Sequence, residues 1–91
     1  MSLERWEAWY TGHVQGVGFR YTTRSVARGY AVDGFVQNLP DGRVHVVVEG
    51  QASEVSGFMA EVERQLGHFI REVRKDKLSA NGEFAGFEVR H

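Results

Sequence analysis

Apolar and polar positions alternate in several short stretches of this chain, and each of these stretches predicts a β-strand. A period of two places successive side chains on opposite faces of a strand, so that one face is buried and the other is polar. The pattern covers residues 5–13, 32–39, 43–49, 69–78 and 84–90. The sequence therefore predicts four longer strands and a short one near the C-terminus.

The composition of these stretches also predicts which way some side chains face and where a strand lies in the sheet. From Val44 to Val48 every second valine is expected to face the core, with Val47 and Glu49 among the side chains that face away. Stretch 69–78 is heavily charged, which is typical of a strand at the edge of a sheet. The segment Pro40-Asp41-Gly42 has the composition of a tight turn and is expected to close a hairpin.

Two stretches have the period of a helix. Apolar or small side chains recur every three or four residues over 19–30 and again over 53–66. Gly29 is expected to end the first helix, Ser53 to cap the start of the second, and Gly67 to follow its end.

The predicted order is strand, helix, strand, strand, helix, strand. This order fits an α+β ferredoxin-like sandwich (βαββαβ), in which two helices cover one face of an antiparallel sheet, with a short extra C-terminal strand possible. The 91 residues suffice for one core, so a single domain over residues 1–91 is expected.

Composition limits the function. The formal net charge of −1 gives no general attraction for nucleic acid or anionic membranes, and the lack of cysteine excludes disulfides and zinc–thiolate sites. No apolar stretch has the length of a signal peptide or a membrane span. The histidines have no metal-ligand spacing and are expected on the surface: His13, His45, His68 and His91. We expect a cytoplasmic monomer without metal or cofactor.

The segment that carries most chemistry joins the first strand to the first helix. It reads Gly12-His13-Val14-Gln15-Gly16-Val17-Gly18-Phe19-Arg20. Gly16 and Gly18 allow backbone conformations that turn several N–H groups toward one point, near the positive end of the helix dipole. Arg20 could add two parallel hydrogen bonds to a phosphate. Taken alone, an ordinary tight turn followed by a surface arginine explains the segment as well.

A second polar side chain stands at the end of the second strand. Asn38 closes the stretch Gly34-Phe35-Val36-Gln37-Asn38, and its carboxamide offers both a donor and an acceptor that could hold a water molecule. Taken alone, an asparagine that starts the following turn is the simpler interpretation.

Together, the two segments resemble the two signatures of the acylphosphatase family, G-x-V-Q-G-V-x-F-R and G-aromatic-V-x-N followed by a D-G turn. Length and element order are similar to the family as well. The resemblance implies hydrolysis of small acyl phosphates to a carboxylate and inorganic phosphate, without metal or cofactor. This sequence departs from the family pattern at Tyr10, Trp6 and His68, where the family commonly has other residues.

The resemblance also implies roles for individual residues. The phosphate-binding set comprises Gln15, Gly16, Val17, Gly18, Phe19 and Arg20. Arg20 is the essential phosphate ligand, and Asn38 orients the attacking water. Arg24 and Arg28 follow Arg20 at four-residue steps, but we interpret them as a solvated helix face outside the site.

Two other functions remain as alternatives. One is an RNA-binding module of similar fold, which reads bases with aromatic side chains on central strands. The stretch 43–49 offers His45, Val47 and Glu49 instead, which argues against RNA. The other is a domain that binds phosphate or another small ligand without hydrolysing it.

Overall fold

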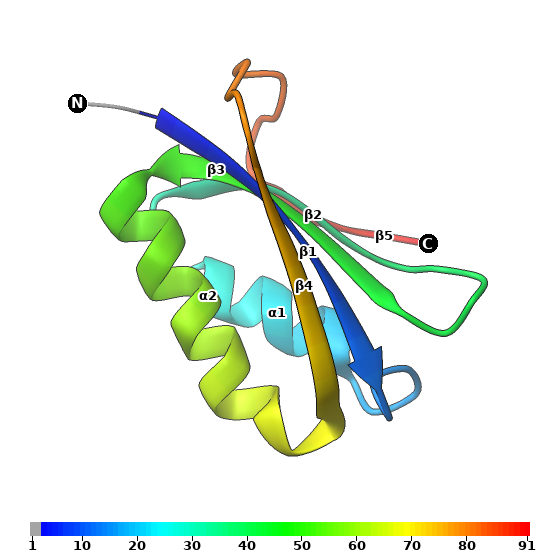
Figure 1. The fold of residues 1–91 in the computed structure, drawn as a ribbon. Coiled ribbons are helices and arrows are strands. Elements are labelled where there is room, and N and C mark those ends of the chain that lie inside the picture. Colours follow the sequence, from blue (N-terminus) through cyan, green and yellow to red (C-terminus); the bar gives the residue numbers. More distant parts are fainter. Residues whose placement is uncertain (1–2) are drawn as a thin grey trace.

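The computed structural model describes residues 3–91 and contains one five-stranded sheet and two α-helices. The elements, in chain order, are β1 (Leu3–Gly12), α1 (Phe19–Ala27), β2 (Val32–Asn38), β3 (Val44–Gln51), α2 (Ala52–Leu66), the short 3₁₀-helix η1 (Gly67–Phe69), β4 (Ile70–Leu78) and β5 (Phe87–Arg90). Both helices pack on the same face of the sheet (Figure 1). The predicted ferredoxin-like α+β fold is confirmed.

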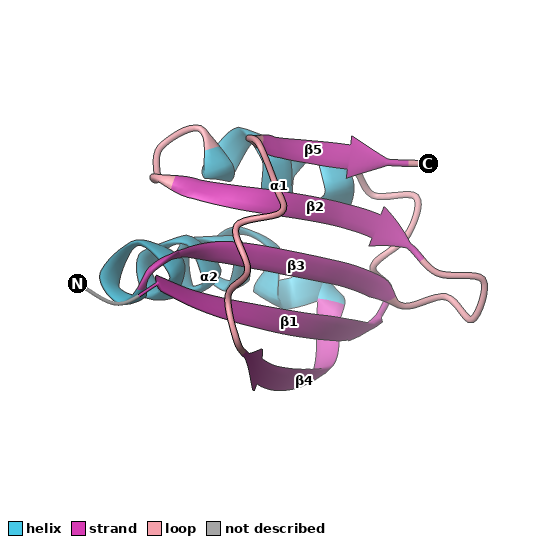
Figure 2. Cartoon of the chain, turned by 90° about the horizontal axis from the view of Figure 1, so that it is seen from above, coloured by secondary structure: helices cyan, strands magenta, loops and turns pink. Residues whose placement is uncertain are grey.

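The strands lie in the order β4-β1-β3-β2-β5, so the charged strand β4 is at an edge as predicted. Strands β1 to β4 pair antiparallel. The extra strand β5 pairs parallel to β2, so the sheet is not antiparallel throughout. Its direction follows from the path of segment 79–86, which leaves β4 at one edge and crosses the open face of the sheet to the other edge (Figure 2).

The crossing segment buries side chains that the sequence pattern assigned to an outer face. The backbone N–H groups of Asn81 and Gly82 donate to the Glu49 carboxylate at 3.2 and 3.0 Å, and the Phe84 ring lies 5.8 Å from that of Phe35. Glu49 and Val47 face away from the helices as predicted, but only 5% and 1% of their surfaces are exposed. The crossing segment thus acts as a partial third layer.

The core lies between the sheet and the helices. It contains the apolar side chains predicted to be buried from both helices and from one face of β3. Its members include Phe19, Val26, Val44, Val46, Val48, Val55, Phe58, Val62 and Leu66. No helix within residues 3–91 combines the length and the apolar character needed to cross a membrane.

Gly29 directly follows the C-cap Arg28 of α1, as predicted for a residue that ends the helix, whereas the predicted cap at Ser53 needs correction. α1 ends at Ala27, and the N–H of Gly29 donates to the Val26 carbonyl at 3.0 Å without Gly29 taking a positive φ. α2 begins at Ala52 directly after β3, so Ser53 lies inside the helix and caps nothing. Strand β3 continues into the helix without a connecting loop, which leaves no room for a serine cap.

His45 is also placed differently from its expected surface position. Its imidazole stacks on the Trp9 ring with 5.0 Å between centroids, and its Nε2 lies 2.9 Å from Oε1 of Glu7. It is therefore half-buried on the open face of the sheet.

Because of Tyr10, the unfolding free energy is expected to fall as the pH rises in the alkaline range. Burial, aided by the nearby Glu63 carboxylate, raises the pKa of the Tyr10 hydroxyl, which donates to Glu63 Oε2 at 3.0 Å. Above pH ~10 the unfolded chain loses this proton and the folded chain keeps it, so the unfolding free energy should fall by up to ~1.4 kcal/mol per pH unit.

Tyr10→Phe should remove this slope, as measured by urea unfolding between pH 9 and 11. The exposed Tyr21→Phe is the control and should keep it. An unchanged slope in Tyr10→Phe would show that other groups cause the alkaline loss of stability.

Candidate functional site

The loop between β1 and α1 contains two glycines in a left-handed backbone conformation. Gly16 and Gly18 both have a φ of +79°, a left-handed conformation that favours glycine. Gly18 is the N-cap of α1, and the first-turn N–H groups of a helix have no acceptor within the helix. No acidic side chain lies in that first turn. The positive end of the α1 dipole is therefore free of a negative neighbour there.

A cavity of about 100 Å³ opens at this helix end. Its lining residues come from the loop, the first turn of α1 and the end of β2: Val14, Gly16, Gly18, Phe19, Arg20, Tyr21 and Asn38. The two separate sequence segments thus meet around one hollow. Four of the six residues predicted to bind phosphate line it, and Gln15 and Val17 do not.

Gln15 has a bridging role. Its side-chain Nε2 donates to the carbonyl oxygens of Leu39 and Arg43 at 2.9 and 3.0 Å. These carbonyls belong to the turn between β2 and β3, directly after Asn38. The side chain therefore ties the glycine loop to the strand end that carries Asn38. Val17 is partly buried against the core.

Arg20 is held by the C-terminus of the chain. Its Nη1 donates to the Arg90 carbonyl at 3.1 Å and lies 3.3 Å from His91 Nδ1. Among residues 3–91 no carboxylate forms an ion pair with it. The guanidinium charge therefore remains available to an anion. This contact could not be predicted from the sequence, because it depends on the path of the crossing segment.

Asn38 presents a buried acceptor. Its Oδ1 is inaccessible and has no hydrogen-bond partner within the described part of the chain. Leaving such a carbonyl without a donor costs about 1–3 kcal/mol, so the site favours a ligand or water that donates to it.

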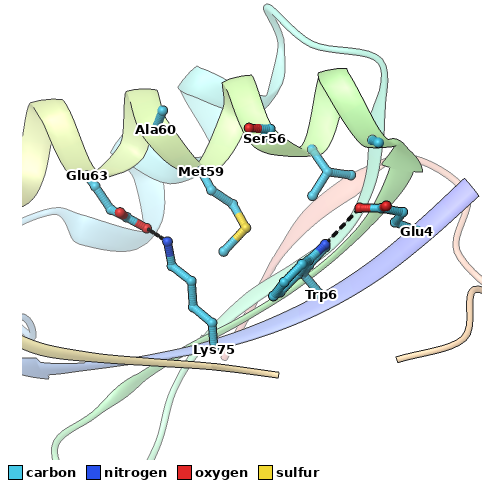
Figure 3. A pocket seen from close by; sticks show the side chains of 9 residues that line it. Glu4, Trp6, Ser56, Met59, Ala60, Glu63 and Lys75 are labelled. Carbon is cyan, nitrogen blue, oxygen red and sulfur yellow. Dashed lines mark hydrogen bonds and ion pairs between the residues drawn. The ribbon is translucent and has the colours of Figure 1, made fainter. Parts of the chain in front are cut away.

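A larger cavity, of about 430 Å³, lies between α2 and strands β1 and β4 (Figure 3). Trp6 and Met59 line it together with the carboxylates of Glu4 and Glu63. Trp6 Nε1 donates to Glu4 at 3.0 Å, and Lys75 lies 2.7 Å from Glu63. Two carboxylates and a single, already paired lysine make this cavity unsuitable for phosphate.

Residues 3–91 contain no group of three or more His, Asp or Glu side chains arranged to hold a metal ion. The polar side chains that line the small cavity are those of Arg20, Tyr21 and Asn38.

Comparison with known proteins identifies a family whose members are similar to this chain. The model of the family described as Acylphosphatase matches residues 6–89. The acylphosphatase of Marinobacter nauticus is 36% identical over the full length of both chains, and that of Archaeoglobus fulgidus is 48% identical over 62% of this chain. For three curated relatives the aligned part spans only 46–63% of the relative's length.

Among solved structures, the acylphosphatase from Bacillus subtilis superposes with a TM-score of 0.86. The match covers 98% of this chain and 99% of that chain at 24% sequence identity, which bears on the fold alone.

Proposed function

Since this chain belongs to the acylphosphatase family, we propose that it hydrolyses small acyl phosphates to a carboxylate and inorganic phosphate. The observation that carries the proposal is the meeting of the glycine loop, Arg20 and Asn38 around one small cavity. Phosphoryl transfer depends mainly on positioning and on stabilising the charge of the phosphoryl oxygens.

Arg20 and the loop bind the phosphoryl group in this proposal. The loop amides and the α1 N-terminus face the phosphoryl oxygens, and the guanidinium adds two parallel hydrogen bonds. The Arg90 carbonyl, 3.1 Å from Arg20 Nη1, orients the guanidinium before substrate arrives. Charge on the phosphoryl oxygens in the transition state is then met by fixed donors.

Asn38 orients the attacking water. Its carboxamide lines the cavity, where the NH₂ group donates to that water or to a phosphoryl oxygen, and Oδ1, which has no other partner within the described chain, accepts from the water once the side chain turns toward it. The bond from water oxygen to phosphorus forms as the bond from phosphorus to the acyl oxygen breaks. The water's second proton leaves to a phosphate oxygen or to solvent.

The leaving group needs no proton. A carboxylate has a conjugate acid of pKa about 4 and leaves as the anion at neutral pH. The proposed reaction therefore requires no general acid.

Hydrolysis of benzoyl phosphate in the presence of a chelator tests this function. The wild-type chain should release benzoate and phosphate at the same rate with and without chelator. Phosphate binding without hydrolysis would show that the chain is a noncatalytic phosphate-binding domain. Hydrolysis that falls when chelator is added would contradict a reaction without metal.

Gly16→Val should lower both phosphate affinity and kcat/KM by at least tenfold. A β-branched residue at φ +79° costs about 1–3 kcal/mol and moves the loop amides away from their shared point. Because a Cβ at Gly16 would meet no atom within 4 Å, the loss would come from conformation and not from a clash.

Gly82→Val is the matched control, since Gly82 also has a positive φ, +70°, with open space around it, but lies in the crossing segment. It should cost similar stability and keep activity. Wild-type kcat/KM in Gly16→Val would show that the loop amides do not bind the phosphoryl group.

A further inference from the structure

Helix α1 carries an unbalanced positive charge. Arg20, Arg24 and Arg28 follow at four-residue steps, a spacing that places side chains on one side of a helix. The sequence has no Asp or Glu anywhere from residue 8 to residue 32. The segment that forms the glycine loop and α1 therefore carries no negative side chain, although the whole chain has a net charge of −1.

Arg24 and Arg28 line a cavity of their own. It measures about 200 Å³ and is formed by Arg24, Ala27, Arg28, Val32 and Phe87. The sequence pattern alone placed these arginines on a solvated face. In the structure Arg28 is exposed and Arg24 is partly buried, and both also border a hollow whose apolar side is made by Phe87 and Val32.

This second cavity and the phosphate cavity lie along one helix–strand junction. Arg20 reaches the Arg90 carbonyl at the end of β5, whereas Arg24 and Arg28 border Phe87 at its start. One four-residue step along a helix is about 6 Å, so the backbones of Arg20 and Arg24 are separated by about the length of a short acyl group. Tyr21 connects them, since it lines the phosphate cavity and its ring lies 5.4 Å from the Arg24 guanidinium.

The two arginines also lack acidic partners. Other arginines of this chain form ion pairs with nearby carboxylates, namely Arg5, Arg43, Arg64, Arg74 and Arg90. Within residues 3–91, Arg24 and Arg28 form none, and neither does Arg71 on the distant strand β4. Unpaired guanidinium groups beside an apolar floor match a ligand with a carbon skeleton and a negative end.

We propose that Arg24 and Arg28 select acyl phosphates whose acyl part carries a second anionic group, a carboxylate or a phosphate. This inference rests on the proposed hydrolysis at Arg20 and Asn38. The phosphoryl group occupies the small cavity, the carbon skeleton lies against Phe87, and the distal anion meets the two guanidinium groups. These arginines contribute to substrate binding and specificity and take no part in bond breaking.

Paired substrates test the selection. We compare kcat/KM for benzoyl phosphate and 4-carboxybenzoyl phosphate, which differ only in a distal carboxylate. The wild-type chain should prefer the carboxylated substrate by roughly tenfold at low salt, with a smaller preference at high salt. Arg24→Gln and Arg28→Gln should each reduce the ratio, and the double variant should bring it close to one.

Arg71→Gln is the matched control. It removes the same charge from an exposed position on β4, at the opposite edge of the sheet from β5, and should leave the ratio unchanged. An equal fall of the kcat/KM ratio in Arg71→Gln would show a general charge effect and contradict the selection by Arg24 and Arg28.

The outcomes separate the two proposals. Hydrolysis of benzoyl phosphate without preference for the carboxylated substrate would overturn the selection and leave the proposed function standing. Hydrolysis of neither substrate would overturn the proposed function, and the selection with it.

Discussion

Arg20→Ala is expected to abolish hydrolysis of benzoyl phosphate and binding of inorganic phosphate together. Arg20 is the guanidinium in the lining of the small cavity, and no carboxylate among residues 3–91 neutralises it. Removing a fixed donor that faces developing phosphoryl charge costs roughly 10³-fold or more in kcat/KM. Steady-state hydrolysis and phosphate titration by calorimetry measure the two losses.

Arg71→Ala provides the control for loss of one positive charge and should retain full activity. Arg20→Lys separates charge from geometry: an ammonium keeps the charge but cannot form two parallel bonds, so it should restore only part of the affinity. Full activity in Arg20→Lys would contradict the bidentate contact. Unchanged phosphate binding in Arg20→Ala would place the anion elsewhere.

Asn38→Ala is expected to lower kcat by roughly 10²-fold and to change phosphate affinity far less. Its buried Oδ1 has no partner within the described chain, so its proposed role is to hold the water and not the phosphate. Because the substitution removes an unsatisfied acceptor, the unfolding free energy should not fall as it does when a buried hydrogen bond is broken.

Gln37→Ala is the control for Asn38→Ala, since it precedes Asn38 on β2 and points to the other face of the sheet. It should preserve kcat. Equal losses of phosphate affinity and turnover in Asn38→Ala would show that Asn38 binds the phosphoryl group and does not act through the water.

The strands and helices were predictable because their signals are local. The alternation in β1 and β3 and the three- and four-residue repeat in α2 lie within each element, and burial follows them. The parallel pairing of β5 could not be predicted, because it depends on how segment 79–86 crosses the sheet. The burial of Glu49 has the same cause, since its partners come from that segment.

In the candidate site, too, local features could be predicted from the sequence and contacts between distant segments could not. The positive φ of Gly16 was predictable, because a bend from a strand into a helix with two glycines needs that conformation. The contact of Gln15 with the Leu39 and Arg43 carbonyls, and that of Arg20 with Arg90, join parts of the chain far apart in sequence. Arg24 and Arg28 lie on an accessible helix face as predicted, but the cavity that they share with Phe87 could not be predicted, because it depends on where β5 pairs.

The most direct test of an anion cradle at the start of α1 is a titration of the isotope-labelled protein with inorganic phosphate, in chelator, followed by amide NMR. The backbone signals of residues 16–20 should shift together along one saturable curve, and Arg20→Ala should remove that curve. Signals of residues 16–20 that stay unmoved at saturating phosphate, or shifts confined to the Arg24–Arg28 cavity, would contradict the site.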